Sequence, residues 1–268
     1  MFAIVIPYFK LTFFEATLQS LANQTDKRFK VYIGDDASPE SPTFLLEKYK
    51  DKIDFDYIKF DTNLGGISLV KQWERCIERV GDEEWIMVLG DDDVLGATCV
   101  AAFYSNLNEI QENKINVIRY ASMVINQEGI AKSDIYLHPK LEKATDFFIR
   151  RFEGRTRSSL SEYIFRKANL LQIRFKDLPL AWYTDLLAVL EVSEFNLIFT
   201  INEAVVYFRL SDLNITSRKD NLVQKNIASF HFYFYLLNKK KNYFNLEQRM
   251  FLLMRLEKTF LDNKKNVR

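Results

Sequence analysis

The chain has few of the residues that interrupt, crosslink or strongly charge a protein. Its 268 residues include 8 glycines, 5 prolines and 2 cysteines. Two cysteines cannot make a disulfide framework for this length, and no CxxC or histidine-rich spacing suggests a zinc site. Because 37 basic residues face 36 acidic ones, no overall field draws the chain to nucleic acid. These absences exclude a disulfide scaffold and a general polyanion binder, and they fit a reducing, cytoplasmic setting.

The chain also lacks a long apolar run. No stretch approaches the roughly 20 apolar residues that span a bilayer. The N-terminal segment MFAIVIPYFK has no basic residues ahead of its short apolar run, so it is typical of a strand and not of a signal peptide. Apolar residues make up 48% of the sequence and aromatics 15%, which is enough for a sizeable core. We expect a globular protein that is not integral to a membrane.

Strand and helix patterns alternate through the first third of the chain. Short apolar, β-branched runs predict strands, and apolar residues at helical spacing predict helices between them. The strands are expected at 3–7, 29–34, 55–60 and 85–89, and the helices at 11–21, 43–49 and 67–80. This alternation predicts an α/β fold with a mostly parallel, twisted sheet flanked by helices.

Polar residues follow each predicted strand. Open parallel sheets bind ligands beyond the carboxyl ends of their strands, near the point where the strand order reverses. The residues at these ends are Pro7 and Tyr8, Asp35 and Asp36, Asn63 with Gly65 and Gly66, and Asp91 to Asp93. We therefore expect the functional site at this edge of the sheet.

The three consecutive aspartates are the most informative of these groups. Adjacent carboxylates after a buried strand repel one another, and burial raises their pKa unless a cation compensates. Mg²⁺ or Mn²⁺ takes one or two protein carboxylates and completes its shell with phosphates and water, which suggests a diphosphate substrate. A solvated acidic turn is the alternative. In an extended segment Asp91 and Asp93 would point to the same side.

Two common nucleotide motifs are missing. The sequence has neither GxGxxG nor GxxxxGK[ST], so hydride transfer and ATP hydrolysis lose their usual support.

Five segments resemble the family 2 glycosyltransferases of bacteria, which have the GT-A fold. The segments are AIVIPYFK, LQSLANQT, FKVYIGDDAS, NLGGISLVKQ and WIMVLGDDDVL, and they stand in the family's order and spacing. The resemblance continues more loosely to INEAVVYFRLSDLNIT. It implies a GT-A domain over 1–216, with a nucleotide-binding half at 1–93 and an acceptor half at 94–216, followed by a helical tail at 217–268.

The resemblance assigns residues to the nucleotide. It implies that Asp35 contacts the base of the donor and that Asp36 supports this contact, with Pro7 and Tyr8 nearby. Asn63, Lys71 and Asp91 also take positions on the nucleotide side. Lys71 stands where the family often has arginine, and it would pair with phosphate as a point charge without a bidentate fork.

The resemblance also implies a metal site for Mn²⁺ or Mg²⁺. The family's acidic motif is Asp-x-Asp, and Gly90 stands in place of its first acid, so Asp92 and Asp93 inherit the latter half. This differs from the alternation argument, which favours Asp91 with Asp93; we follow the family register because a turn need not stay extended. Many relatives carry a late histidine ligand that is missing here, and Asp212 is a speculative substitute.

The resemblance places the catalytic base at Asp185. The sequence Trp182-Tyr183-Thr184-Asp185 occupies the position of the family's Glu-Asp pair, in which the aspartate is the general base of inverting transfer. Without that register, Asp185 would be equally typical of a helix N-terminus. Trp182, Tyr183 and Thr184 are candidate acceptor contacts, although large aromatics beside a leucine-rich helix commonly belong to the core.

The implied reaction is transfer of a hexosyl or N-acetylhexosaminyl group from a nucleotide-diphosphate sugar, with uridine as the expected base. The implied acceptor is a saccharide or a lipid-linked saccharide in surface polysaccharide (capsule or O-antigen) biosynthesis. Two alternatives stay open. One is a sugar nucleotidyltransferase, and the other is a catalytically inactive saccharide-binding or assembly protein.

The tail differs from the rest of the chain in charge. Residues 221–268 contain ten Lys or Arg and three Asp or Glu, a net charge of +7, which leaves −6 for residues 1–220. Its aromatic and leucine residues alternate with basic ones, as in an interfacial helix attracted to anionic lipid at the inner face of a membrane. Alternatively, these helices cover the rest of the chain or form a homodimer surface, since amphipathic helices usually serve cores.

Overall fold

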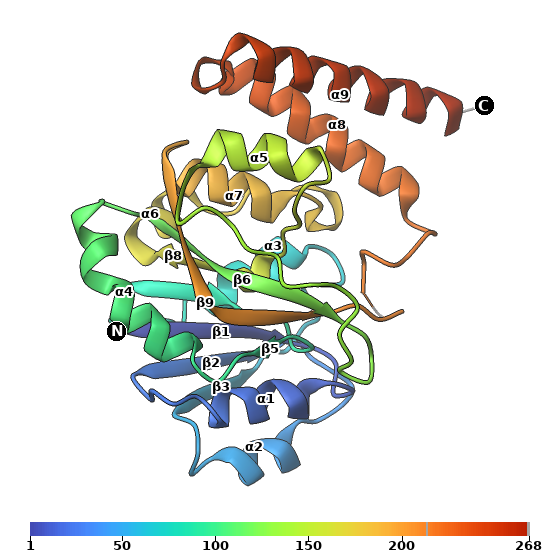
Figure 1. The fold of residues 1–268 in the computed structure, drawn as a ribbon. Helices are drawn as coiled ribbons and strands as arrows, with labels where there is room; N and C mark the ends of the chain where they lie inside the picture. Colours follow the sequence, from blue (N-terminus) through green and yellow to red (C-terminus); the bar gives the residue numbers. More distant parts are fainter. Residues whose placement is uncertain (213, 267–268) are drawn as a thin grey trace.

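A central sheet organises the protein. The computed structural model describes residues 1–212 and 214–266, with side chains through Asp262. Within these residues the strands are β1 (Phe2–Tyr8), β2 (Phe29–Asp35), β3 (Phe55–Lys59), β4 (Trp85–Val88), β5 (Val94–Leu95), β6 (Val117–Ile125), β7 (Leu141–Lys143), β8 (Tyr163–Arg166) and β9 (Leu197–Arg209). They form one sheet in the order β3-β2-β1-β4-β8-β6-β9-β5, with β7 paired to β9 (Figure 1).

The sheet has a parallel half and a mixed half. Strand β1 runs parallel to β2 and β4, and β2 runs parallel to β3. Beyond β4, strand β8 is antiparallel to both β4 and β6, while β6 and β9 are parallel. The predicted α/β fold with a sheet flanked by helices is confirmed. The parallel arrangement is limited to the first 88 residues and the β6–β9 pair.

Helices cover both faces of the sheet (Figure 1). They are α1 (Phe14–Ala22), α2 (Thr43–Tyr49), α3 (Leu69–Ile77), α4 (Cys99–Glu112), α5 (Ala144–Phe152), α6 (Lys167–Ile173), α7 (Thr184–Val192), α8 (Leu222–Lys239) and α9 (Leu246–Asn266), with the 3-10 turns η1 (Leu160–Glu162), η2 (Pro179–Ala181) and η3 (Lys241–Tyr243). Two of the predicted helices are shorter than expected. Helix α1 begins at Phe14 instead of Leu11, and α3 ends at Ile77 instead of Val80.

The side chains of β1 alternate between two cores. Phe2, Ile4 and Ile6 pack in the core with α1, α2 and α4, whereas Ala3 and Val5 pack in the core with α3, α5 and α7. All five are fully buried, as expected for a parallel strand that is covered on both faces. This explains why its sequence is a continuous apolar run.

The C-terminal helices form an outer layer over α5 and α7 (Figure 1). From α8, Phe232 and Leu236 are fully buried, and from α9 so is Leu252. These side chains belong to the same core as α5, α7 and the inner face of the sheet. The inner face of the predicted tail therefore covers the rest of the chain, as one of the two interpretations expected. Residues 267–268 of the predicted tail lie outside the described residues. In the described chain, none of the helices has the length and apolar character needed to cross a bilayer.

Candidate functional site

The site forms where β1 and β4 end side by side. The chain leaves β1 toward β2 on one side, and β4 lies on the other side, so this is the point at which the strand order reverses. The carboxylate of Asp91 accepts hydrogen bonds from the backbone N–H groups of Phe9 and Lys10, both at 2.8 Å. Asp91 thus ties the loop after β4 to the loop after β1.

The carboxylates of Asp92 and Asp93 meet above Gly90. A Cβ atom on Gly90 would lie 2.9 Å from Asp92 Oδ1 and 3.1 Å from Asp93 Oδ2, so these two oxygens approach the same point. The other oxygens are occupied: Asp92 Oδ2 accepts from Asn214 Nδ2 at 2.9 Å, and Asp93 Oδ1 accepts from the backbone N–H of Arg209 at 2.8 Å. The absence of a side chain at position 90 therefore leaves room for the pair.

Burial acts on all three acids. It raises the pKa of Asp93 to about 7, and the charge of Asp92 raises this pKa further. Hydrogen bonds from Ser161 and from the backbone N–H of Arg209 act in the opposite direction. It also raises the pKa of Asp91 to about 6 and the pKa of Asp92 above its ordinary value. Two crowded, desolvated carboxylates are the condition that a divalent cation relieves.

The donor set fits Mg²⁺ or Mn²⁺. Asp92 and Asp93 offer two hard oxygen ligands, which is the number that Mg²⁺ commonly takes when substrate phosphates and water complete its shell. Within the described residues no group of three or more His, Cys, Asp or Glu side chains could hold a metal. A cation held by Asp92 and Asp93 would thus keep positions open for phosphate and water.

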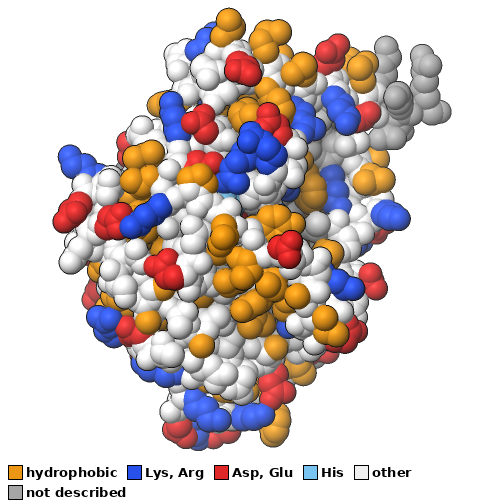
Figure 2. Space-filling model, in the orientation of Figure 1, with side chains coloured by type: hydrophobic (Ala, Val, Ile, Leu, Met, Phe, Trp, Pro, Cys, Tyr) orange, Lys and Arg blue, Asp and Glu red, His pale blue; other side chains and the backbone are white. Residues whose placement is uncertain are grey.

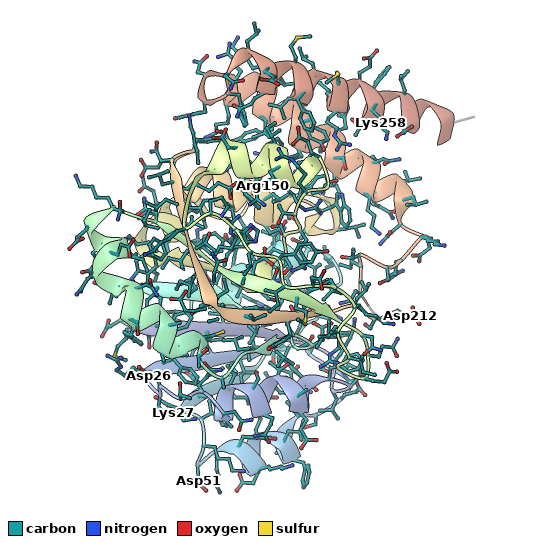
Figure 3. All side chains as sticks on the ribbon, in the orientation of Figure 1. Asp26, Lys27, Asp51, Arg150, Asp212 and Lys258 are labelled. Carbon is teal, nitrogen blue, oxygen red and sulfur yellow. The ribbon has the colours of Figure 1, made fainter. Side chains whose placement is uncertain are left out.

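The segment after β9 contributes braces where the family's late histidine is missing. The guanidinium of Arg209 donates to the carbonyl of Asp92 at 2.9 Å and to two carbonyls of the loop after β6. Asp212, the speculative substitute ligand, is exposed beyond the end of β9 (Figure 3). Asn214 contacts Asp92 instead, a role that no sequence pattern predicts.

Asp35 and Asp36 support the loops on the nucleotide side. Asp35 is fully buried, and its two carboxylate oxygens accept from the Ser38 N–H and the Tyr57 hydroxyl, each at 2.7 Å. Asp36 forms an ion pair with Arg75 and accepts from the backbone N–H groups of residues 64 and 65. Sequence reasoning missed Tyr57 and Arg75.

The other predicted nucleotide residues border the same edge. Asn63 Oδ1 accepts from the N–H of Gly66 at 2.6 Å and shapes the loop that Asp36 anchors. Lys71 is exposed in the first turn of α3. Pro7 pairs with Gly34 in the sheet, and the hydroxyl of Tyr8 donates to the carbonyl of Glu40 at 2.7 Å. The structure therefore brings the predicted nucleotide residues to one edge of the parallel half.

Asp185 lies in a separate, mostly apolar pocket of about 390 Å³. Trp182 and Tyr183 line the pocket with it, together with Arg151 and Arg157. Burial raises the pKa of Asp185, while the N–H of the following residue and the charge of Arg151 oppose this shift. Asp185 is therefore a carboxylate that holds a proton more readily than an aspartate in water, as a general base requires.

The backbone that leads into Asp185 is strained. Leu180, Ala181 and Tyr183 have φ angles of 60°, 52° and 66°, in the left-handed region that non-glycine residues seldom adopt. Such strain costs roughly 1–3 kcal/mol per residue and clusters at functional sites, where surrounding contacts hold it. Here the ring of Tyr183 packs 5.1 Å from Phe152 and 5.2 Å from Phe232 of α8.

The three candidate acceptor residues are not equivalent. Trp182 and Tyr183 line the pocket and also pack against the core. Thr184 is fully buried, and its hydroxyl donates to the carbonyl of Lys176 at 2.8 Å. Thr184 thus fixes the start of α7 and does not line the pocket.

The pocket and the acid cluster share their walls. Phe208 and Leu210 line the pocket, and the residue between them, Arg209, donates its backbone N–H to Asp93. Likewise, residues 158–160 line the pocket, and the next residue, Ser161, accepts a hydrogen bond from the N–H of Gly90 at 3.0 Å. Asp185 and the paired aspartates therefore lie on adjoining parts of one region.

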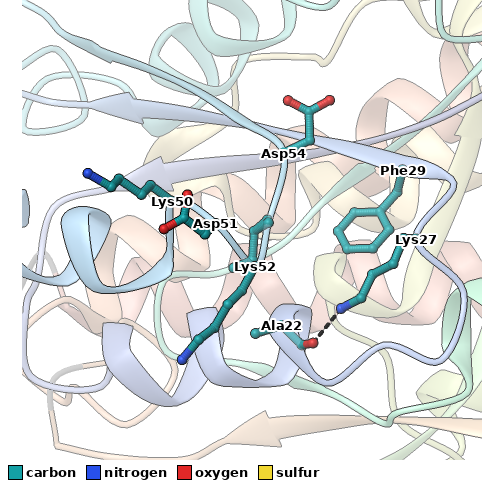
Figure 4. A pocket seen from close by; sticks show the side chains of 8 residues that line it. Ala22, Lys27, Phe29, Lys50, Asp51, Lys52 and Asp54 are labelled. Atoms are coloured by element: carbon teal, nitrogen blue, oxygen red, sulfur yellow. Dashed lines mark hydrogen bonds between the residues drawn. The ribbon is translucent and has the colours of Figure 1, made fainter.

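A larger hollow lies at the opposite edge of the sheet. It measures about 640 Å³ and is bordered by Ala22, Lys27, Phe29 and residues 50–54 (Figure 4). These residues stand at the beginnings of β2 and β3, whereas the acids stand at the strands' ends. The hollow therefore takes no part in the candidate site.

Comparisons with solved structures show proteins of similar fold. The chain resembles the crystal structure of Staphylococcus aureus TarS 1–349 with a TM-score of 0.65 and 15% identity, over 97% of this chain and 72% of that one. For TarS 1–349 in complex with UDP-GlcNAc the TM-score is 0.69 and the identity 16%, over 97% of this chain and 71% of that one. For a longer TarS chain the TM-score is 0.67 and the identity 18%, over 95% of this chain and 42% of that one.

Among curated protein sequences none matches the chain. The family described as "Glycosyl transferase family 2" matches residues 3–166, which include β1 to β4, the three aspartates and β8. The chain belongs to glycosyl transferase family 2.

Proposed function

We propose that this glycosyltransferase transfers a sugar from a nucleotide-diphosphate donor to the hydroxyl of a saccharide or lipid-linked saccharide, with inversion, in surface polysaccharide (capsule or O-antigen) biosynthesis. The observation that carries the proposal is the position of Asp185 in a pocket whose walls also hold the Asp92–Asp93 pair. This juxtaposition supports the proposal, because a base at Asp185 would lie beside a site for diphosphate.

The residues divide the work between donor and acceptor. Asp35 and Asp36 hold the loops that would receive the nucleoside, and Lys71 offers a positive charge to phosphate. Asp92 and Asp93 would hold Mg²⁺ or Mn²⁺, which when bound neutralises charge on the leaving diphosphate. Asp185 takes the proton from the acceptor hydroxyl, and Trp182 and Tyr183 present ring surface to the acceptor sugar.

A hexosyl or N-acetylhexosaminyl group on uridine diphosphate is the donor that we propose. The support is that TarS 1–349, which has a similar fold, was crystallised with UDP-GlcNAc and with UDP. A direct measurement of the donor tests this proposal. A hydrolysis screen of nucleotide sugars with Mn²⁺ does this without an acceptor, because these enzymes transfer slowly to water.

The test of the catalytic role is Asp185→Asn. Loss of general base catalysis should lower transfer by roughly 10²- to 10⁴-fold. Donor binding, measured by calorimetry, should change little because Asp185 faces the acceptor pocket. Asp134→Asn, an exposed aspartate outside the site, is the matched control. Unchanged transfer by the Asp185→Asn protein would remove this residue from the role.

Two competing activities give different results. A sugar nucleotidyltransferase would release inorganic diphosphate from a sugar phosphate and a nucleoside triphosphate. The loop after β1, residues 7–10, has no glycine to cradle such phosphates. A catalytically inactive saccharide-binding protein would show no Mn²⁺-dependent binding of nucleoside diphosphates in calorimetry.

A lipid-linked acceptor is supported by an exposed apolar stripe on α9. Its members are Leu246, Met250, Leu253, Met254, Phe260 and Leu261, each between 48% and 75% exposed. They lie at helical spacing, opposite the face that buries Leu252. Figure 2 shows hydrophobic and basic side chains together over this outer layer. Apolar and basic groups on one helix are typical of binding to anionic membrane surfaces.

Deletion of the tail would be a poor test because α8 and α9 share the core. We therefore propose Met250→Glu with Leu253→Glu, compared with Ile130→Glu, which is 62% exposed on another surface. The paired substitution should abolish co-sedimentation with vesicles of anionic lipid, and the control should not. Equal recovery of all proteins, or a homodimer in light scattering that the paired substitution dissociates, would refute the membrane role.

A further inference from the structure

Arg151 lines the pocket around Asp185, the proposed acceptor pocket, and forms no ion pair with any of the described side chains. It stands in the last turn of α5 and lines the pocket beside Asp185. Its Nε atom is shielded from solvent and makes no hydrogen bond, and within the described side chains no acid lies within ion-pair distance. Its neighbour Arg150, by contrast, pairs with Glu142 and contacts His138.

The apolar surroundings of Arg151 raise the cost of leaving it without an ion pair. The pocket walls are mostly apolar, and they include Leu69, Trp73 and Leu186. A charge in such surroundings is expensive unless another group pairs with it. The charge of Arg151 acts on Asp185, but no ion pair joins them. A favourable interaction with the α5 carboxyl end and a ring contact with Phe152 at 5.9 Å offset part of the cost, yet the buried Nε of Arg151 still has no acceptor.

Arg157 adds hydrogen-bond donors to the same pocket. One of its terminal nitrogens binds the buried Glu162 at 2.8 Å and Ser122 at 2.9 Å, and its guanidinium lies 4.5 Å from the ring centre of Phe208. Glu162 balances the charge of Arg157, so Arg157 would contribute oriented hydrogen bonds to a ligand but no net charge. Arg151 has no such carboxylate within ion-pair distance among the described side chains.

We infer that the acceptor pocket recognises a saccharide that carries an anionic group, a carboxylate or a phosphate, near its nucleophilic hydroxyl, and that Arg151 is the residue that binds this group. The inference rests on the proposed function, since it concerns the acceptor of that same site. The ionised Asp185 would repel an anionic acceptor, and Arg151 supplies the opposing charge. A guanidinium suits either anion because its donors match both in a bidentate arrangement.

Matched pairs of probes test the inference. Methyl β-glucuronide is compared with methyl β-glucoside, and glucose 6-phosphate with glucose, by NMR titration of the full chain. The wild type should bind the anionic member of at least one pair roughly 10- to 100-fold more tightly, as charge-assisted hydrogen bonds allow. The pair with the larger preference distinguishes carboxylate from phosphate.

Variants assign the preference to the residue. Arg151→Met should abolish the preference by weakening the anionic probes to the affinity of their neutral partners, while Arg151→Lys should keep part of it. Arg155→Met is the control, because Arg155 is exposed in the same segment and pairs with Glu153. Melting curves of each variant confirm that it is folded.

The outcomes separate this inference from the proposed function. Equal binding of both members of each pair, no binding of the anionic members, or a preference that survives Arg151→Met would overturn the inference. None of these results depends on turnover of the donor. If the anionic probes bind through Arg151 but no nucleotide sugar is hydrolysed, the inference stands and the proposed reaction fails.

Discussion

The substitution Gly90→Ala tests whether the two carboxylates above Gly90 form the diphosphate site. The added methyl group would lie 2.9 Å from Asp92 Oδ1 and 3.1 Å from Asp93 Oδ2. Ordinary contacts begin near 3.4 Å, so the carboxylates must move by about 0.5 Å and about 0.3 Å. Metal coordination tolerates deviations of only about 0.2 Å. The change should therefore spoil the site without removing a charge.

The expected cost follows from crowding. Overpacking typically costs about 1–3 kcal/mol, which corresponds to a loss of about 5- to 150-fold in Mn²⁺-dependent affinity for UDP if it falls on the bound state. Calorimetry with UDP and Mn²⁺ measures this directly. A melting curve measures the share that falls on folding, at about 2–4 °C per kcal/mol for a chain of this size.

Gly81→Ala is the matched control. A Cβ atom there would lie 3.1 Å from the Tyr32 hydroxyl and 3.4 Å from Glu83 Oε2, so it also crowds polar groups, but at the opposite edge of the sheet. It should lower the melting temperature and leave nucleotide binding intact. If Gly90→Ala binds UDP as the wild type does, the two carboxylates do not form the site that we describe.

Three further predictions concern pH, the outer helices and the metal. Because burial raises the pKa of Asp185, the base form is lost as pH falls through that raised value; the acid limb of kcat/KM should therefore lie above the ordinary aspartate pKa of about 3.9, and a limb at or below it would contradict the assignment. Leu252→Ala should cost about 2–5 kcal/mol in chemical denaturation, since Leu252 is fully buried, whereas Leu253→Ala, 49% exposed, should cost less than about 0.5 kcal/mol; equal costs would show that α9 does not share the core. Titration with Mn²⁺ should give weak binding to the protein alone and clearly tighter binding when UDP is present, because the protein supplies two carboxylates; tight binding without nucleotide would refute this account.

The sequence predicted the parallel half of the fold closely. Strands β1 and β4 are apolar runs followed by polar residues, because strands covered on both faces must be apolar throughout. Beyond Asp93 the antiparallel pairing of β8 with β4 and β6 had no local signal, since pairing partners far apart in sequence are chosen by tertiary packing.

The residues of the candidate site also include some that the sequence predicts and some that it does not. Residues directly after strands, such as Asp35 and Asp92, could be predicted because their positions follow from the strand ends. Arg151 and Asn214 could not, because each reaches the site from a distant segment. In sequence, Arg151 is one of two arginines in the last turn of a helix, a position that basic residues often take to complement the helix dipole.

Two departures from the family pattern lie next to Asp92 and Asp93, and both affect how a cation could be bound. Gly90 replaces the first acid of the motif, and the structure shows that the space of its side chain is taken by the approaching carboxylates of Asp92 and Asp93. The late histidine is missing, and the neutral amide of Asn214 donates to the outer oxygen of Asp92. Both changes reduce the ligands that the protein could give to a cation while keeping its two remaining acids fixed. The metal site that we propose would therefore depend on phosphate oxygens to complete its coordination, which would couple the binding of the ion to the binding of the nucleotide.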